Sequence, residues 1–382
     1  MREGRDMKIA FPHMGNACIP LRGLVEYLGA EAVVPERPHR GTLDRGVRHA
    51  PEFVCLPFKI TLGDCMNALD NGAEVLAMVC GMWACRFGYY GQVQHMILKD
   101  LGYHFDSLLI GREDPRVIWE KFSRYLGKSV LLKAPGALAM LRAKAVAVEE
   151  MESIARKVRP REARKGDADA LLERYLEELD AASTLRRVRE LREESREALR
   201  SVPLRGEEDI VRVRIVGELY VLLEPSLNFD LVRRLGTHLG VEAQPVLSTY
   251  RWLLSPLWLD PFLHLHSSRF RRLTRSYLPY ILGGEEHMTI GGTLDAKRDG
   301  YDGVIHAYPL TCMPENICRT ILPHICNGGD IPLLDLCYDE HTSPVGTATR
   351  LEAFVDMLRS RKGNGDAILS RHTSLSGQPC CL

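Results

Sequence analysis

The sequence has no long uncharged apolar run and no excess of either charge. Among its 382 residues, 50 Lys and Arg balance 50 Asp and Glu. This balance does not favour nucleic acid or an anionic membrane surface as the main partner. No run of about 18 apolar residues is present, and residues 1–13 lack the features of a secretory signal. We therefore expect a cytoplasmic protein with no nucleic-acid or membrane partner.

The composition also excludes disordered and fibrous classes of protein. Hydrophobic residues make up 45% of the chain and charged residues 26%, which is typical of folded globular proteins. A single hydrophobic core rarely grows beyond about 250–300 residues. A chain of this length is therefore expected to form more than one lobe.

Strand patterns that alternate with helix patterns predict an α/β fold. The expected strands cover residues 8–12, 32–35, 74–80, 107–111, 211–223, 241–246, 303–310 and 331–340. The expected helices cover residues 23–29, 60–72, 91–102, 229–239, 315–325 and 349–359. This alternation is typical of mostly parallel sheets.

The middle of the chain has a purely helical pattern and many charges of both signs. Apolar residues recur there at helical spacing, namely Leu171, Leu172, Tyr175, Leu176 and Leu179. We expect long surface helices, interrupted near residues 160–166, that bridge two lobes. The other interpretation is a face that binds a partner.

Together these patterns predict two Rossmann-like parallel-sheet lobes with a charged helical middle segment. The expected N-terminal lobe is 1–135, the bridging segment 136–205, the C-terminal lobe 206–360 and a flexible tail 361–382.

Eleven cysteines are the most informative feature of the composition. In a reducing compartment, clustered cysteines bind metals or carry out redox chemistry more often than they form disulfides. Three of them have similar surroundings. Cys55 and Cys312 each stand two residues before a proline, and Cys85 follows the strand pattern EVLAMV. We expect all three at the carboxyl ends of strands, where open α/β sheets bind ligands.

The cysteine spacing excludes two common kinds of metal site. No CxxC pair is matched by a second pair as in a zinc knuckle, and no CxxCxxC run is present as in a ferredoxin. A site assembled from distant loops fits a cluster held between lobes. Three thiolates leave one iron of a [4Fe–4S] cube open to substrate, water or a bridging sulfide. Cys80, five residues before Cys85, is the main alternative ligand, or else a small core residue.

Two basic side chains lie close in sequence to these cysteines. Lys59 and Arg86 would offset the negative charge of a thiolate-bound cluster or bind an anionic substrate. Ordinary salt bridges are the other interpretation of both.

Several segments, taken in order, resemble a known family. They are CLPFKITLGDCMNAL from Cys55, ACRFGYYGQ from Ala84, RIVGELYVLLEPSLN from Arg214 and GVIHAYPLTCMPENI from Gly303. This set is similar to the 2-hydroxyacyl-CoA dehydratase D-component superfamily, in the branch of proteins related to acyl-CoA dehydratase activases, also called CoA protein activases. Glu218 and Tyr220 match the GE-x-Y segment of that family, which implies that they line the cleft.

The resemblance implies an iron–sulfur protein of anaerobic metabolism. The cluster, a [4Fe–4S] cube or a sulfide-bridged double cubane [8Fe–9S], would be held by Cys55, Cys85 and Cys312. It would carry out low-potential one-electron chemistry of a dehydratase (lyase) or reductase. Electrons would come from an ATP-hydrolysing actin-like activator with its own [4Fe–4S] cluster. A homodimer, or a heterodimer with a paralogous subunit, is implied as well.

The sequence departs from the family after two of the cysteines. Arg86 stands where the dehydratase subunits have proline, and Met313-Pro314 follows Cys312, which weakens the inference of dehydration and leaves that of the cluster intact. The chain has no GxxxxGK[ST] loop, so we do not expect it to be an ATPase. The competing hypotheses are a non-catalytic cluster-carrying or scaffold subunit of a larger related complex, and a zinc-stabilised binding protein.

Overall fold

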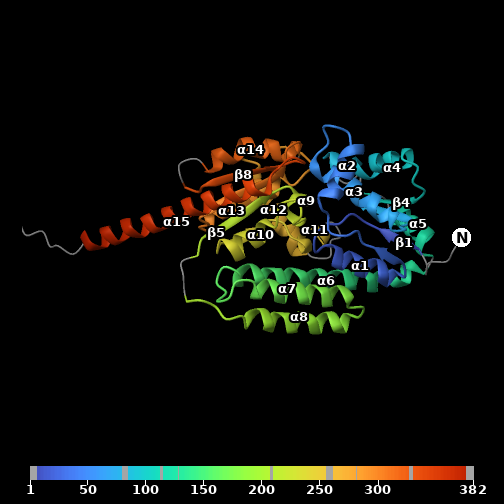
Figure 1. Ribbon diagram of the computed structural model, residues 1–382, viewed down its shortest axis with the longest axis horizontal. Coiled ribbons are helices and arrows are strands. Elements are labelled where there is room, and N and C mark those ends of the chain that lie inside the picture. Colours follow the sequence, from blue (N-terminus) through green and yellow to red (C-terminus); the bar gives the residue numbers. More distant parts are fainter. Residues whose placement is uncertain are drawn as a thin grey trace, which may run out of the picture.

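Two α/β lobes and a layer of three helices make up the molecule (Figure 1). The computed structural model describes residues 7–79, 85–111, 115–127, 129–206, 210–254, 261–280, 282–326 and 330–375. Among the described helices, none has the length and apolarity needed to cross a membrane.

Each lobe is built on a four-stranded, all-parallel sheet. The N-terminal sheet contains β1 (Lys8–Ala10), β2 (Glu31–Val33), β3 (Val75–Val79) and β4 (Asp106–Ile110) in the order β2-β1-β3-β4. The C-terminal sheet contains β5 (Arg212–Gly217), β6 (Glu242–Pro245), β7 (Gly303–Pro309) and β8 (Leu333–Tyr338) in the order β6-β5-β7-β8. The predicted fold of two parallel-sheet lobes is confirmed.

Helices connect the strands of each sheet. In the N-terminal lobe they are α1 (Cys18–Leu28), α2 (Arg40–His49), α3 (Leu56–Asp70), the short η1 (Arg86–Tyr89), α4 (Tyr90–Asp100) and α5 (Pro115–Leu126). In the C-terminal lobe they are α9 (Leu219–Leu223), α10 (Leu231–Arg233), η2 (Arg234–His238), α11 (Thr249–Leu254), α12 (Pro261–Thr274), α13 (Glu286–Arg298), α14 (Met313–Cys326) and α15 (Pro344–Leu375). The sequence patterns did not predict α2, α5, α11, α12 and α13.

The charged middle segment forms three packed helices, α6 (Val130–Val158), α7 (Asp167–Ala181) and α8 (Leu185–Arg200). They run along one side of both lobes in Figure 1. The 29 residues of α6 give it a length of about 43 Å, enough to reach α1 in one lobe and α11 in the other. The predicted apolar stripe of α7 is confirmed, because Leu172, Tyr175, Leu176 and Leu179 are buried in the core of this layer.

Two close backbone approaches require glycine and position the elements of the site. Gly217 ends β5 with φ of 140°, and a Cβ there would stand 1.9 Å from the carbonyl oxygen of Ala307 on β7. A Cβ at Gly46 of α2 would stand 1.6 Å from the carbonyl oxygen of Lys59 on α3. Only glycine lets β5 turn so sharply into α9 and lets α2 pack so closely on α3.

Three sequence predictions differ from the structure. Residues 51–54 before Cys55 form an irregular turn and not a strand, and they follow Ala50, the C-cap of α2. The expected strand 211–223 ends at Gly217, and its second half is the helix α9, which Glu218 caps. The final helix is longer than the predicted 349–359 and covers Pro344–Leu375.

Candidate functional site

All three predicted ligand cysteines stand immediately before a helix. Cys55 is the N-cap of α3, Cys85 is the N-cap of η1, and Cys312 precedes α14. The prolines two residues after Cys55 and Cys312 occupy the first turns of their helices, where proline is favoured. The prediction of a strand end was therefore wrong for Cys55, whereas Cys85 and Cys312 do follow β3 and β7.

The structure brings the three cysteine loops together through Arg86. Its guanidinium donates one hydrogen bond to the carbonyl of Phe53, at 3.0 Å, and another to the carbonyl of Thr311. Arg86 thus joins its own neighbour Cys85 to the loops of Cys55 and Cys312. Because Thr311 belongs to the C-terminal lobe, this contact also crosses between the lobes.

The thiols influence one another electrostatically. Burial raises the pKa of the Cys55 thiol to about 12, with a smaller contribution from the charge of Cys85. Burial likewise raises the pKa of Cys312, to which Cys55 makes a smaller contribution. All three thiols are therefore protonated at neutral pH in the metal-free protein, and a metal would have to displace their protons.

Among the other predicted residues, Glu218 acts electrostatically on all three thiols. It caps α9 by accepting a hydrogen bond of 2.9 Å from the backbone N–H of Val221. Its charge contributes to the raised pKa values of Cys55, Cys85 and Cys312. Burial raises the pKa of Glu218 itself to about 7, so near neutral pH this carboxyl is suited to give or take a proton.

Two other predicted residues lie between the lobes and make contacts away from the thiols. Lys59 is 6% exposed and forms an ion pair with Glu340, which follows β8. The hydroxyl of the fully buried Tyr220 donates to the carbonyl of His13, beyond the end of β1. Both residues join the lobes to each other. Cys80 lies outside the described residues.

Sequence reasoning missed a group of carboxylates on the C-terminal lobe. Glu285 caps α13, Glu286 begins it, and Glu315 lies in the first turn of α14. Burial raises the pKa of Glu285 to about 7, with contributions from Glu286, Glu315 and Glu218. The pattern GGEE before a helix was the available signal, since glycines followed by acidic residues are typical of a helix start.

Glu315 belongs to a buried hydrogen-bonded chain. Its Oε2 lies 2.9 Å from Nε2 of His306, and Nδ1 of His306 lies 2.8 Å from Oδ1 of Asp335. Thr289 also donates to Glu315. His306 is therefore a core histidine with a partner on each ring nitrogen.

Tyr90, from the aromatic segment that follows Cys85, contacts the site directly. Its hydroxyl is hydrogen-bonded to the Cys55 thiol. Its ring packs edge-on against Phe58, at 4.9 Å between ring centres, and against Phe87 at 5.0 Å. These contacts shield one side of the Cys55 thiol from water.

The donor set suits a thiophilic metal group, since thiolates are the ligands of iron–sulfur clusters. The helix N-termini behind the cysteines and the charge of Arg86 both favour negative charge on sulfur. In the described part of the chain, however, no group of three or more His, Cys, Asp or Glu side chains is arranged to hold a metal ion. Cys85 acts electrostatically on Cys55, Cys55 acts on Cys312, and the Cys55 thiol is hydrogen-bonded to Tyr90.

The remaining described cysteines lie in packed regions. Cys65 and Cys318 are on helices as predicted and are buried. Cys18 accepts a hydrogen bond of 3.4 Å from the backbone N–H of Met14.

The comparisons with known proteins found no match, either to a family model or to a curated protein.

Proposed function

We propose that Cys55, Cys85 and Cys312 hold an iron–sulfur cluster between the two lobes. The observation that carries this proposal is the pair of hydrogen bonds from Arg86 to the loops of the other two cysteines. Three remote segments of the chain meet there, and each presents a thiol at the start of a helix. Such a meeting of cysteine-bearing loops is typical of a site and supports the proposal.

The charges around the thiols support a redox role. Arg86 offsets negative charge at the sulfurs, whereas Glu218, Glu286 and Glu315 add negative charge nearby. Negative charge close to a cluster makes it harder to reduce, because reduction adds another electron. We therefore propose low-potential one-electron chemistry of the dehydratase or reductase kind, with electrons delivered by an ATP-hydrolysing activator.

The cluster, when bound, would supply single electrons to a substrate. The residues of this chain would exclude water and hold or release a proton. Tyr90 would release the Cys55 thiol to the metal while it and Phe87 keep water from that side. Glu218, with a pKa of about 7, would hold or release a proton at its carboxyl near neutral pH.

The proposal is tested by loading the chain with iron and sulfide under anaerobic conditions. We expect a coloured protein with an EPR signal on reduction. The variants Cys55→Ala, Cys85→Ala and Cys312→Ala should each lose essentially all bound iron. The matched control is Cys318→Ala, because Cys318 is buried on the same helix that Cys312 precedes. A colourless wild-type protein, or equal iron in all four variants, contradicts the proposal.

A further inference from the structure

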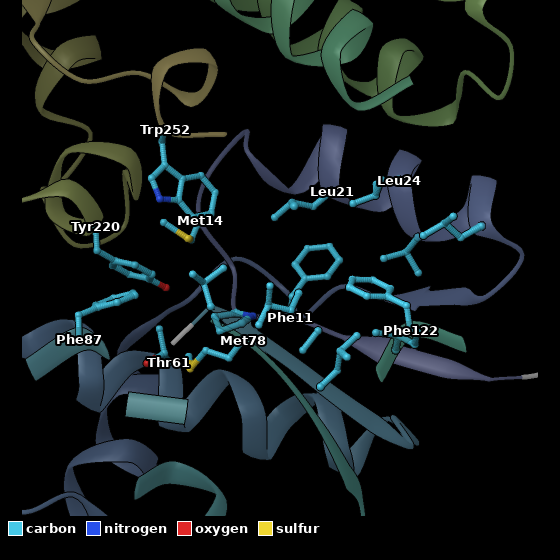
Figure 2. A pocket seen from close by; sticks show the side chains of 18 of the residues that line it. Phe11, Met14, Leu21, Leu24, Thr61, Met78, Phe87, Phe122, Tyr220 and Trp252 are labelled. Carbon is cyan, nitrogen blue, oxygen red and sulfur yellow. The ribbon is translucent and has the colours of Figure 1, made fainter. Parts of the chain in front are cut away.

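A cavity of about 120 Å³ lies inside the N-terminal lobe, between its sheet and the helices that cover one face. Ile9, Ala77 and Leu108 line it from β1, β3 and β4. In Figure 2 Leu24 of α1 and Phe122 of α5 lie toward one end, and Trp252 and Tyr220 lie at the other. Trp252 and Tyr220 come from the C-terminal lobe, so both lobes contribute to the cavity.

The lining of the cavity is apolar. Among the described residues that line it, none carries a charge, and Thr61 and Tyr220 bring the hydroxyls. Both hydroxyls already have partners, since Thr61 donates to the carbonyl of Pro57 at 2.7 Å and Tyr220 donates to His13. A ligand in this cavity would therefore meet hydrocarbon and would find no unpaired polar partner among these hydroxyls.

The size of the cavity is informative as well. Protein interiors are close-packed and contain few voids larger than a water molecule. An apolar cavity of about 150 Å³ in another protein stays dry and binds benzene. The cavity here is of similar size, and several side chains that line it, including Leu24, Ala77 and Phe122, are only partly buried because they face this space.

One end of the cavity is next to the cysteine site. Phe87 lines the cavity and lies two residues after Cys85. Its ring packs against that of Tyr90, whose hydroxyl is hydrogen-bonded to the Cys55 thiol. A ligand with an apolar group in the cavity would thus reach toward the thiols with its other end.

We propose that this cavity binds a small uncharged hydrocarbon group, such as a phenyl group or a short alkyl chain. The site goes beyond the proposed function, because its lining requires no metal. It defines the chemical class of one part of a ligand: uncharged, without hydrogen-bonding groups, and about the size of a benzene ring.

The experiment uses the metal-free full-length chain and benzene as the probe. We expect saturable binding in calorimetry and a matching rise in the thermal unfolding midpoint. At ten times the dissociation constant, benzene should lower the unfolding equilibrium constant about 11-fold. Benzoate should bind at least about tenfold more weakly, because the cavity would bury its carboxylate without a partner.

Two variants fill the cavity from opposite sides. Ala77→Leu acts from β3 and Val25→Phe from α1, and each should abolish benzene binding. The second variant keeps the test decisive if the first does not fold. The matched control is Ala170→Leu on an exposed position of α7, which should bind benzene like the wild type.

The inference is overturned if benzene does not bind saturably to the wild-type chain. It is also overturned if both filled variants bind benzene as tightly as the control, or if benzoate binds as tightly as benzene. Because no iron is present in any arm, these outcomes are independent of whether the cysteines hold a cluster.

Discussion

The two lobes share one strand order but differ in what they present at the site. In both sheets the first strand lies between the second and the third, β2-β1-β3-β4 in one and β6-β5-β7-β8 in the other. Cys85 follows β3 and Cys312 follows β7, so these two cysteines occupy equivalent positions. The match gives the two lobes a loose two-fold relation.

The helix before the third strand shows the difference. In the N-terminal lobe this helix is α3, and Cys55 is its N-cap. In the C-terminal lobe it is α13, and its N-cap is Glu285. One lobe thus places a thiol where the other places a carboxyl, and burial raises the pKa of both groups.

The largest effect on stability is expected at the ion pair between Lys59 and Glu340, which joins the two lobes. Lys59→Met leaves Glu340 without its ion-pair partner and is expected to lower the free energy of unfolding by about 3 kcal/mol. Urea denaturation measures the change. The double variant Lys59→Met/Glu340→Gln should recover part of the loss, because no unpaired charge is left.

The control for this prediction is Lys157→Met, at an exposed position of α6. Its free energy of unfolding should stay within about 0.5 kcal/mol of the wild-type value. Equal losses for Lys59→Met and Lys157→Met would show that the interlobe ion pair contributes nothing to stability.

Glu285, the N-cap of α13 as Cys55 is of α3, should make the free energy of unfolding depend on pH. The pKa of Glu285 is raised from 4.5 to about 7, so the folded chain holds this proton more tightly than the unfolded chain. Its contribution to stability is complete below about pH 4.5 and is lost as the pH rises to about 7. Glu285→Gln removes this loss. Between pH 5 and 8 the wild type should lose about 2 kcal/mol more than the variant.

Urea denaturation at the two pH values measures that difference. Glu218, which also has a pKa of about 7, is present in both proteins and so largely cancels. Glu352→Gln, at an exposed position of α15, should keep the wild-type pH dependence. Identical pH slopes for Glu285→Gln and the wild type would contradict the assignment.

A smaller effect is expected where α9 of one lobe contacts the loop after β1 of the other. Tyr220→Phe removes the hydroxyl that donates to His13 and should destabilise the chain by about 1 kcal/mol. Tyr338→Phe is the matched control, because the hydroxyl of Tyr338 is buried with no hydrogen-bond partner in the described part of the chain. Its removal should be neutral or stabilising, and a larger loss than for Tyr220→Phe would refute the comparison.

The smallest effect on stability is expected at the contact that joins the cysteine loops. Arg86 is exposed, and water can replace its hydrogen bonds to Phe53 and Thr311. Arg86→Met should change the free energy of unfolding by less than about 1 kcal/mol. A loss as large as that of Lys59→Met would contradict this ranking and mean that Arg86 holds the lobes together as strongly as the buried ion pair does.

Local signals select part of the candidate site. Cys55, Cys85 and Cys312 were selected because each has a recognisable neighbourhood, although the Cys-x-Pro pattern of two of them indicated a helix start and not a strand end. Glu285 was missed. The GGEE pattern before α13 marks a helix start, but the burial that raises the pKa of Glu285 depends on residues far away in the chain.

The amino-acid sequence alone determined the alternation of strands and helices and the helical middle segment, because hydrophobic periodicity depends only on neighbouring residues. The length of the chain indicated more than one lobe. Folding in three dimensions decided which loops meet, that Lys59 pairs with Glu340 and that Tyr220 helps to enclose a cavity in the other lobe. Most of these contacts join residues more than a hundred positions apart, and their partners are selected by packing between elements, which local propensity does not encode.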